Sequence, residues 1–243
     1  KAARTGYALM NQADYVKGFN NYDNNEWMWG SRMIQAETNY FYSFFAYMAY
    51  NFNAGVIRTT PKVIFSKLYD EISDTDIRKT LFDPTGKAFD KPTSAHQLFP
   101  YMHKKFRTND VASSVGDIPY MRAAEMYLIE AEALAAQGKD AEAAEVLHSM
   151  VVTRDPAAVK STKTSAELMN EIRIQRRIEL WGEGFRYFDI KRTGAGLNRT
   201  GGNHNATYAS GAMEIGPDDK RWQMAIPDAE IRRTNGIVVQ NPL

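Results

Sequence analysis

The chain has 243 residues, of which 44% are hydrophobic and 24% are charged, and its 30 Lys and Arg side chains nearly balance 29 Asp and Glu side chains. This composition is that of an ordinary globular protein and excludes a disordered chain. A net charge of +1 and the lack of a long basic stripe argue against nucleic-acid binding. The absence of cysteine removes disulfides, thiolate catalysis and cysteine-bound zinc together.

The first hundred residues show little regular periodicity. Residues 20–25 are an asparagine-rich loop by composition, and residues 26–29 fit either a short strand or the start of a helix. Residues 64–72 are expected to form a helix. Further along, residues 88–89 and 101–106 are expected to pair as short strands.

Aromatic side chains crowd the segment from Trp27 to Tyr50, and asparagines are interleaved with them. Sugars present apolar C–H faces and rims of hydroxyl groups, so a site for them needs aromatic platforms beside amide side chains. The ligand-binding residues predicted on this basis are Trp29, Asn39, Tyr40 and Tyr42. A tyrosine-rich core segment is the alternative explanation for the cluster as a whole.

The clearest helical pattern covers residues 119–153. Apolar residues recur at helical spacing from Tyr120 to Leu134, Gly138 provides a left-handed stop, and a second helix runs on to Val152. The many alanines allow the two helices to pack closely and antiparallel. We predict a tetratricopeptide-like helical hairpin, without a second copy at a fixed period.

A third helix is predicted over residues 165–181, and it begins at a capping box formed by Thr164 and Glu167. Residues 194–216 are rich in Gly, Asn and Thr, which is typical of a long surface loop. Residues 222–227 predict an extended, buried segment. The whole pattern predicts a mainly α-helical protein with long loops and a few short strands.

Arginines, carboxylates and aromatic residues are concentrated around the end of the third predicted helix. Such side chains form bidentate ion pairs, which fix one geometry more than they stabilise it. We predict a structural role for the cluster and for its partners in the hairpin, with anion binding as the alternative. The residues in question are Arg122, Glu125, Glu132, Arg177, Glu179, Arg186 and Asp189.

No spacing typical of a catalytic or metal site occurs. The four histidines are scattered, and H-E-x-x-H, G-x-S-x-G and the phosphate-binding G-K-[ST] are absent. We therefore predict no catalytic residues, no metal and no cofactor. A calcium site at Asp74 and Asp76, or at Asp218 and Asp219, is left open, as is a glycoside hydrolase built on two facing carboxylates.

Several segments resemble motifs of the SusD/RagB family, in the family's order and over nearly the whole chain. Residues 117–134 resemble its Pro-x-x-Arg-x-Ala-Glu-x-Tyr-Leu helix, and residues 176–180 and 184–189 resemble its second motif. Residues 226–231 and 240–242 resemble its closing motif. Weaker similarity is found at residues 25–27, 76–78 and 104–106.

The resemblance implies a SusD-like scaffold in which residues 1–243 are a C-terminal domain, with the family's N-terminal half and its lipidated cysteine lying upstream. It implies non-catalytic binding of oligosaccharides by a surface-exposed outer-membrane lipoprotein of Bacteroidetes-type bacteria. It also implies polysaccharide utilization through delivery to a SusC-like TonB-dependent transporter. A RagB-like peptide binder and a helical protein-interaction scaffold are the alternatives. The motifs belong to the scaffold, so the predicted ligand residues depend on the aromatic pattern alone.

Overall fold

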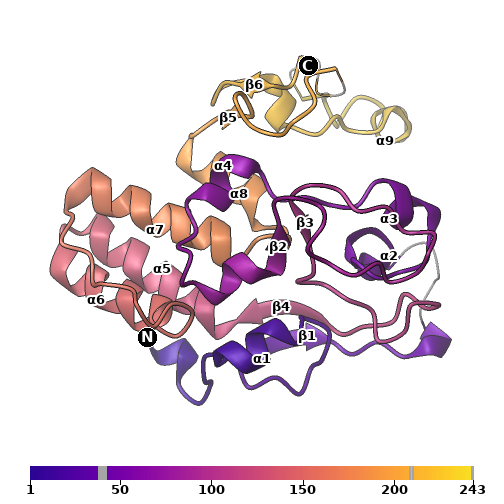
Figure 1. Cartoon of the computed structure of the whole chain (residues 1–243). Helices are drawn as coiled ribbons and strands as arrows, with labels where there is room; N and C mark the ends of the chain where they lie inside the picture. The colour runs from indigo at the N-terminus through magenta and orange to yellow at the C-terminus, as the bar shows by residue number, and fades with distance from the viewer. Residues whose placement is uncertain (38–42, 208, 210, 242–243) are drawn as a thin grey trace. The chain divides into compact units, whose positions relative to one another are not determined.

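The computed structural model describes most of the chain, namely residues 1–37, 43–207, 209 and 211–241. It forms two compact units, Lys1–Glu183 and Gly184–Leu243 (Figure 1). Helices predominate in the structure, and the strands form short two-stranded sheets. The predicted fold class is confirmed. Among the residues that are described, no helix is both long and apolar enough to cross a bilayer.

Three long helices form one side of the first unit: α5 (Ala123–Ala136), α6 (Asp140–Val151) and α7 (Ser165–Glu179). Helix α5 packs against both α6 and α7, and the three lie side by side in Figure 1. The turn between α5 and α6 contains Gly138 at φ 74°, a left-handed conformation that glycine adopts without strain. Buried alanines line the contact between the helices, as the close approach requires: Ala124, Ala131, Ala143 and Ala144.

The prediction that the hairpin begins at residue 119 is wrong, because residues 118–122 form a strand. Strand β4 (Ile118–Arg122) pairs antiparallel with β1 (Trp27–Ser31), and the helix begins only at Ala123. Pairing with a distant segment therefore overrides the local helical spacing. A side chain at position 30 of β1 would lie 2.6 Å from the Ile118 carbonyl oxygen, so only glycine fits the close approach of the two strands.

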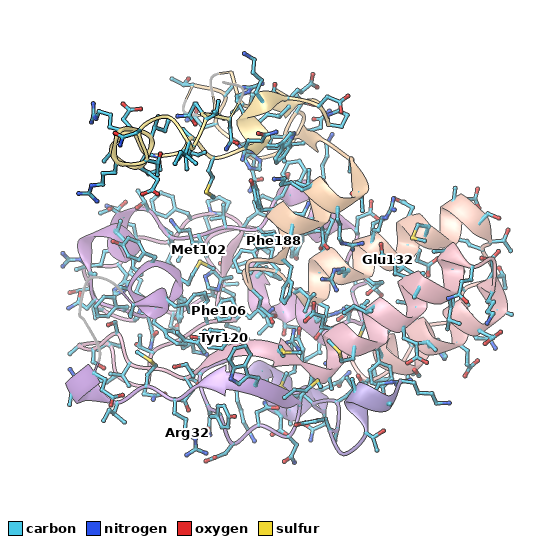
Figure 2. All side chains as sticks on the ribbon, turned by 180° about the vertical axis from the view of Figure 1, so that it is seen from behind. Arg32, Met102, Phe106, Tyr120, Glu132 and Phe188 are labelled. Carbon is cyan, nitrogen blue, oxygen red and sulfur yellow. The ribbon has the colours of Figure 1, made fainter. Side chains whose placement is uncertain are left out.

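Short elements fill the rest of the first unit and surround an aromatic core. Phe106, labelled in Figure 2, is fully buried and makes edge-to-face contacts with Phe19 at 6.1 Å and Phe44 at 5.0 Å between ring centroids. The elements are η1 (Ala2–Arg4), α1 (Gln12–Val16), η2 (Gln35–Glu37), α2 (Phe44–Met48), α3 (Gly55–Thr59), α4 (Ser66–Asp70), η3 (Ile77–Leu81), β2 (Phe82–Asp83) and β3 (Met102–His103).

Two expectations for this region are corrected by the structure. The helix expected over residues 64–72 covers only Ser66–Asp70. The strand that pairs with Met102–His103 is Phe82–Asp83, whereas residues 88–89 form no strand. The reason is a turn closed by Asp83, whose carboxylate accepts hydrogen bonds from the Thr85 and Ala88 amides at 2.9 and 2.7 Å and so ends the strand early.

The second unit contains α8 (Phe185–Thr193), β5 (Leu197–Asn198), β6 (Glu214–Ile215), η4 (Lys220–Trp222) and α9 (Asp228–Arg233). The predicted loop over residues 194–216 is closed by the pairing of β5 with β6. Trp222 is buried, and the Tyr187 hydroxyl donates a 2.6 Å hydrogen bond to its carbonyl. The expectation of a buried segment over residues 222–227 is correct for Trp222 and wrong for Met224, which is 78% exposed.

Candidate functional site

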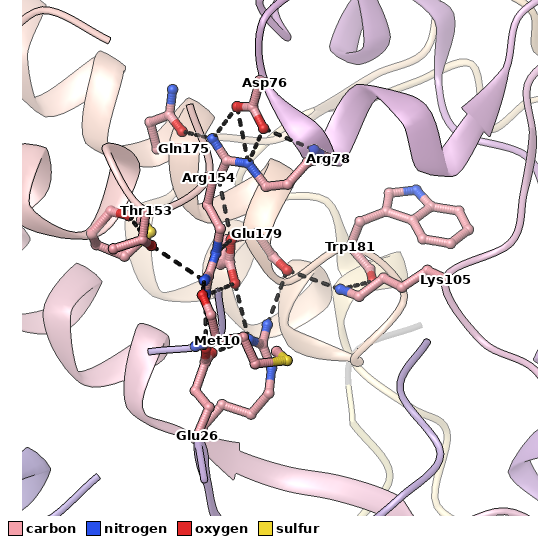
Figure 3. A network of polar contacts seen from close by, with 12 residues as sticks. Met10, Glu26, Asp76, Arg78, Lys105, Thr153, Arg154, Gln175, Glu179 and Trp181 are labelled. Carbon is pink, nitrogen blue, oxygen red and sulfur yellow. Dashed lines mark hydrogen bonds and ion pairs between the residues drawn. The ribbon is translucent and has the colours of Figure 1, made fainter. Parts of the chain in front are cut away.

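A buried network of charged side chains lies in the first unit and is centred on Glu179, in the last turn of α7 (Figure 3). One carboxylate oxygen of Glu179 accepts from Arg122 Nη1 at 2.9 Å and from Arg154 Nη2 at 3.2 Å. The other oxygen accepts from Arg78 Nη1 at 3.2 Å. Burial raises the pKa of Glu179, but the three arginines outweigh that effect and hold the pKa well below its ordinary value.

Glu26 provides a second buried carboxylate, directly before β1. Its Oε1 atom accepts from Arg122 Nη1 at 2.5 Å, and its Oε2 atom accepts from Arg154 Nη2 at 2.8 Å. Arg122 and Arg154 therefore bridge Glu26 and Glu179. Since Arg122 is the last residue of β4, the network ties the end of that strand to the start of β1 and to the end of α7.

Lys105 and Glu183 extend the network beyond the end of α7. The Lys105 ammonium donates to the Glu179 and Trp181 carbonyls at 2.9 Å each and to Glu183 Oε1 at 2.6 Å. Burial raises the pKa of Glu183, but Arg122 and Lys105 lower it further than burial raises it. The lysine thus binds orphan carbonyl groups at the end of α7, which stabilises the helix terminus.

The arrangement of this network fits a structural role. A glycosidase requires two carboxyl groups that face each other across an open cleft. Glu26 and Glu179 have no exposed surface and share the same Arg122 nitrogen atom. Buried ion pairs of this kind fix one arrangement of the backbone, and here they fix the strands β1 and β4.

The residues predicted to form the charged cluster divide between the two units. In the first unit, Arg176 donates to Glu125 at 3.1 Å, and Glu132 and Arg177 are half-buried on α5 and α7. In the second unit, α8 carries the other two predicted members. There Asp189 is buried and accepts from Arg192 Nε at 2.9 Å, whereas Arg186 is exposed.

Sequence reasoning missed Glu26, Arg78, Lys105 and Arg154 as members of the buried network, and it considered Asp76 only as a calcium ligand. Three of the four missed residues lie in the segments of weaker family similarity, 25–27, 76–78 and 104–106, and that similarity was the available signal. Arg154 lies in the turn after α6, and no pattern in the sequence marks it as buried.

Three of the four aspartates considered for a calcium site bind cations of the chain itself. Asp76 binds Arg78 at 2.6 Å, Asp74 binds Lys79 at 2.6 Å, and Asp219 binds Arg221 at 2.7 Å. In the described part of the chain, His, Asp and Glu side chains nowhere gather in a group of three or more that could hold a metal ion.

An exposed pair of aromatic residues lies on the ribbon of β1 and β4. Trp29 is 59% exposed and Tyr120, labelled in Figure 2, is 46% exposed. Their ring centroids are 5.2 Å apart, and the ring planes meet at 64°. We call these two residues the aromatic platform. Trp29 was among the predicted ligand residues, whereas Tyr120 was assigned to the core side of a helix because the strand was not foreseen.

The other predicted ligand residues, Asn39, Tyr40 and Tyr42, lie outside the described residues. The neighbouring part of the aromatic segment is mostly core. Trp27 is 5% exposed and Phe45 is fully buried, so the alternative explanation holds for them. Trp29 and Tyr47, which is 46% exposed, are the aromatic residues of this segment that face solvent among those that the structure describes, and Trp29 has a second exposed ring, Tyr120, beside it.

The comparisons with known proteins agree with the fold and with the motifs. The model of the SusD family matches residues 4–243. No curated protein matches the chain in sequence. A SusD-like carbohydrate binding protein from Bacteroides vulgatus is 25% identical, with a TM-score of 0.75 over 96% of this chain and 52% of its own.

Two further solved structures are similar in fold. A SusD superfamily protein from Bacteroides thetaiotaomicron is 23% identical, with a TM-score of 0.76 over 98% of this chain and 53% of its own. Surface glycan-binding protein A from Bacteroides thetaiotaomicron is 16% identical, with a TM-score of 0.64 over 98% of this chain and 56% of its own. The chain thus spans about half the length of these solved relatives. Because the family model matches the chain almost from end to end, the chain belongs to the SusD family.

Proposed function

We propose that the protein binds oligosaccharides on the aromatic platform and leaves their glycosidic bonds intact. The observation that carries this proposal is the exposure of Trp29 and Tyr120 side by side on one ribbon. Large aromatic rings in contact with each other are normally buried, and exposed apolar patches in soluble proteins mark binding sites. The C–H face of a sugar ring is a flat apolar surface that such rings can cover.

The angle between the two rings favours a ligand with more than one sugar unit. At an interplanar angle of 64°, the two rings cannot both stack on the same sugar face. One ring can stack on one unit while the other ring contacts the next unit or the edge of the same unit. The buried network holds both strands in place, so the rings are presented without a large ordering cost on binding.

The family supports the same function. SusD-family proteins are binding proteins without a catalytic step. A relative that is 25% identical is described as a SusD-like carbohydrate binding protein. On family membership alone, we also propose that residues 1–243 act as the C-terminal domain of a surface-exposed outer-membrane lipoprotein that passes its ligand to a SusC-like TonB-dependent transporter.

Isothermal titration of the intact protein with a panel of oligosaccharides tests the proposal. A sugar that covers one face of Trp29 removes from water roughly half of the 150–250 Å² that an aromatic ring can bury. At about 25 cal/mol per Å², this contributes ~2 kcal/mol, so Trp29→Ala is expected to raise the Kd about 30-fold. The matched control is Phe188→Ala, which removes an exposed aromatic residue from α8 in the second unit.

Three results would count against the proposal. Equal affinities of the wild type and of Trp29→Ala would remove the platform from the site. Binding of peptides in place of glycans would favour the RagB-like alternative. Release of reducing sugar from a polymer would show catalysis, which the proposal denies.

A further inference from the structure

A polar pocket lies in the first unit, next to the start of β1. Its volume is about 480 Å³, which is within the range of roughly 300–1,000 Å³ that is typical of small-molecule sites. Its walls come from residues 8–11, from α1 and from the loop that leads into β1. Five asparagines line this pocket: Asn11, Asn20, Asn21, Asn24 and Asn25. We call it the asparagine pocket.

The protein uses only part of the hydrogen-bonding capacity of these amides. Asn21 Oδ1 accepts from the Asp23 amide at 2.9 Å, and Asn24 Oδ1 accepts from the Glu26 amide at 2.9 Å. These two bonds orient the side chains and leave both Nδ2 groups without a partner among the described residues. Within the same part of the chain, the Asn25 side chain makes no bond at all. The pocket therefore offers a ligand oriented amide groups at Asn21 and Asn24 and a further amide at Asn25.

The charged groups of the pocket are already neutralised. Asp14 binds Lys17 at 2.6 Å, and Asp23 binds Arg32 at 2.5 Å. Glu26 is fully buried and is held by the arginines of the network. No carboxylate is left over to attract a cation, and Lys17 is not free to hold an anion. The electrostatics of the pocket favour a neutral ligand.

From these observations we propose that the asparagine pocket is a second binding site, and that it takes a neutral sugar unit through its hydroxyl groups. Each hydroxyl both donates and accepts, which matches amide side chains that present NH₂ and C=O groups in one plane. The pocket has no exposed aromatic ring among its lining residues, so it binds by hydrogen bonds where the platform binds by stacking. Asn25 and Trp29 are four residues apart, which is roughly 13 Å along an extended chain.

This inference deepens the proposed function by adding a site for a short neutral sugar, but its test is separate. The pocket variant is Asn24→Asp combined with Asn25→Ala. Aspartate at position 24 retains the oxygen that accepts from the Glu26 amide, and it replaces the NH₂ donor with a charged oxygen that can only accept. A second variant, Ala8→Phe, fills the pocket from an exposed lining position. The matched control is Asn170→Ala, an exposed asparagine on α7 outside the pocket.

The binding of glucose, galactose, mannose and xylose to the intact protein is measured by saturation-transfer NMR titration, with glucuronate as an anionic probe. The binding of calcium chloride is measured by isothermal titration. We expect at least one neutral monosaccharide to bind. With two or three hydrogen bonds lost, its Kd should rise about tenfold or more in the double variant. It should rise similarly in Ala8→Phe and remain unchanged in Asn170→Ala.

The inference is overturned if no neutral monosaccharide binds, if both pocket variants bind it as the wild type does, or if only calcium or glucuronate binds. An oligosaccharide titration of the same variants and of Trp29→Ala separates the two proposals. If oligosaccharide affinity depends on Trp29 while the pocket variants change nothing, the pocket fails and the proposed function stands. If a monosaccharide depends on the pocket but no oligosaccharide binds, the pocket stands and the proposed function fails.

Discussion

Removing the charge of Glu179 should destabilise the protein more than any surface substitution of the same kind. Within the described residues, the network joins four cations to four carboxylates through the ion pairs that Figure 3 shows in part. Glu179→Gln leaves four cations against three carboxylates in a site whose side chains are buried. Breaking a buried ion pair from one side costs about 3–5 kcal/mol, because the remaining charge has no partner.

The free energy of unfolding of the intact protein is measured by urea denaturation at pH 7. A loss of 3–5 kcal/mol corresponds to a decrease of roughly 6–20 °C in Tm for a chain of this length. Neutral pH is the correct condition. Folding lowers the pKa of Glu179, so its charge makes its full contribution to stability above the unfolded pKa of about 4.3. That contribution is lost as the pH falls through the folded pKa.

The matched control is Glu171→Gln, the same chemical change on the same helix. Glu171 forms a partly exposed pair with Lys163 at 3.1 Å, and exposed pairs contribute about 0–1 kcal/mol. If Glu179→Gln destabilises the protein no more than Glu171→Gln does, the network does not hold the fold together and the reasoning is refuted. The double variant Arg154→Met with Glu179→Gln restores the balance of charge and should lose less stability than the two single variants together.

Two further predictions concern a histidine and a glycine. Burial lowers the pKa of His103 to about 3, so folding favours the neutral form of this histidine. The neutral histidine therefore makes its full contribution to stability above the unfolded pKa of about 6.5, and this contribution is lost as the pH falls. Between pH 6.5 and pH 5 this effect should lower the free energy of unfolding of the wild type, measured by urea denaturation, by about 1.6 kcal/mol. His103→Gln should show a smaller loss, and identical pH profiles of the two proteins would contradict the prediction. Gly30→Ala places a methyl group 2.6 Å from the Ile118 carbonyl oxygen, so it should lower the free energy of unfolding by about 1–3 kcal/mol and weaken oligosaccharide binding. The control Gly55→Ala places its methyl group in open space and should change neither stability nor binding. A wild-type Tm for Gly30→Ala would contradict the close approach of β1 and β4.

The long helices of the first unit could be predicted from the sequence because their signals are local. Apolar residues at helical spacing and a glycine stop mark α5 and α6, and both helices are found within a few residues of the predicted bounds. The start of α7 shows the limit of such signals. Thr164 forms no capping hydrogen bond, and the Ser165 amide instead donates to Asp140 Oδ2 of α6 at 2.9 Å. A neighbouring helix thus supplies an acceptor for the first turn of α7, where the sequence predicted that the turn would be capped by its own side chains.

The network and the platform could not be predicted in the same way because their members are far apart in the sequence. Arg154 is 128 residues from Glu26, and Arg122 is 96 residues from it. Nothing in the local pattern indicates that these charges meet. Tyr120 shows the same limit, since its spacing fits the stripe of a helix and only the pairing with β1 turns it toward solvent.

The scaffold and the proposed ligand site are therefore parts of one structure. Glu26 immediately precedes β1 and Arg122 ends β4, and the Arg122 guanidinium joins Glu26 to Glu179. Trp29 lies three residues after Glu26, and Tyr120 lies two residues before Arg122, so each ring stands on a strand whose end is fixed by the network. A ribbon of two short strands is only marginally stable in water by itself. Because the buried charges hold its two strands in one register, the rings can remain exposed and ordered before a ligand arrives, and the binding energy is not spent on arranging them.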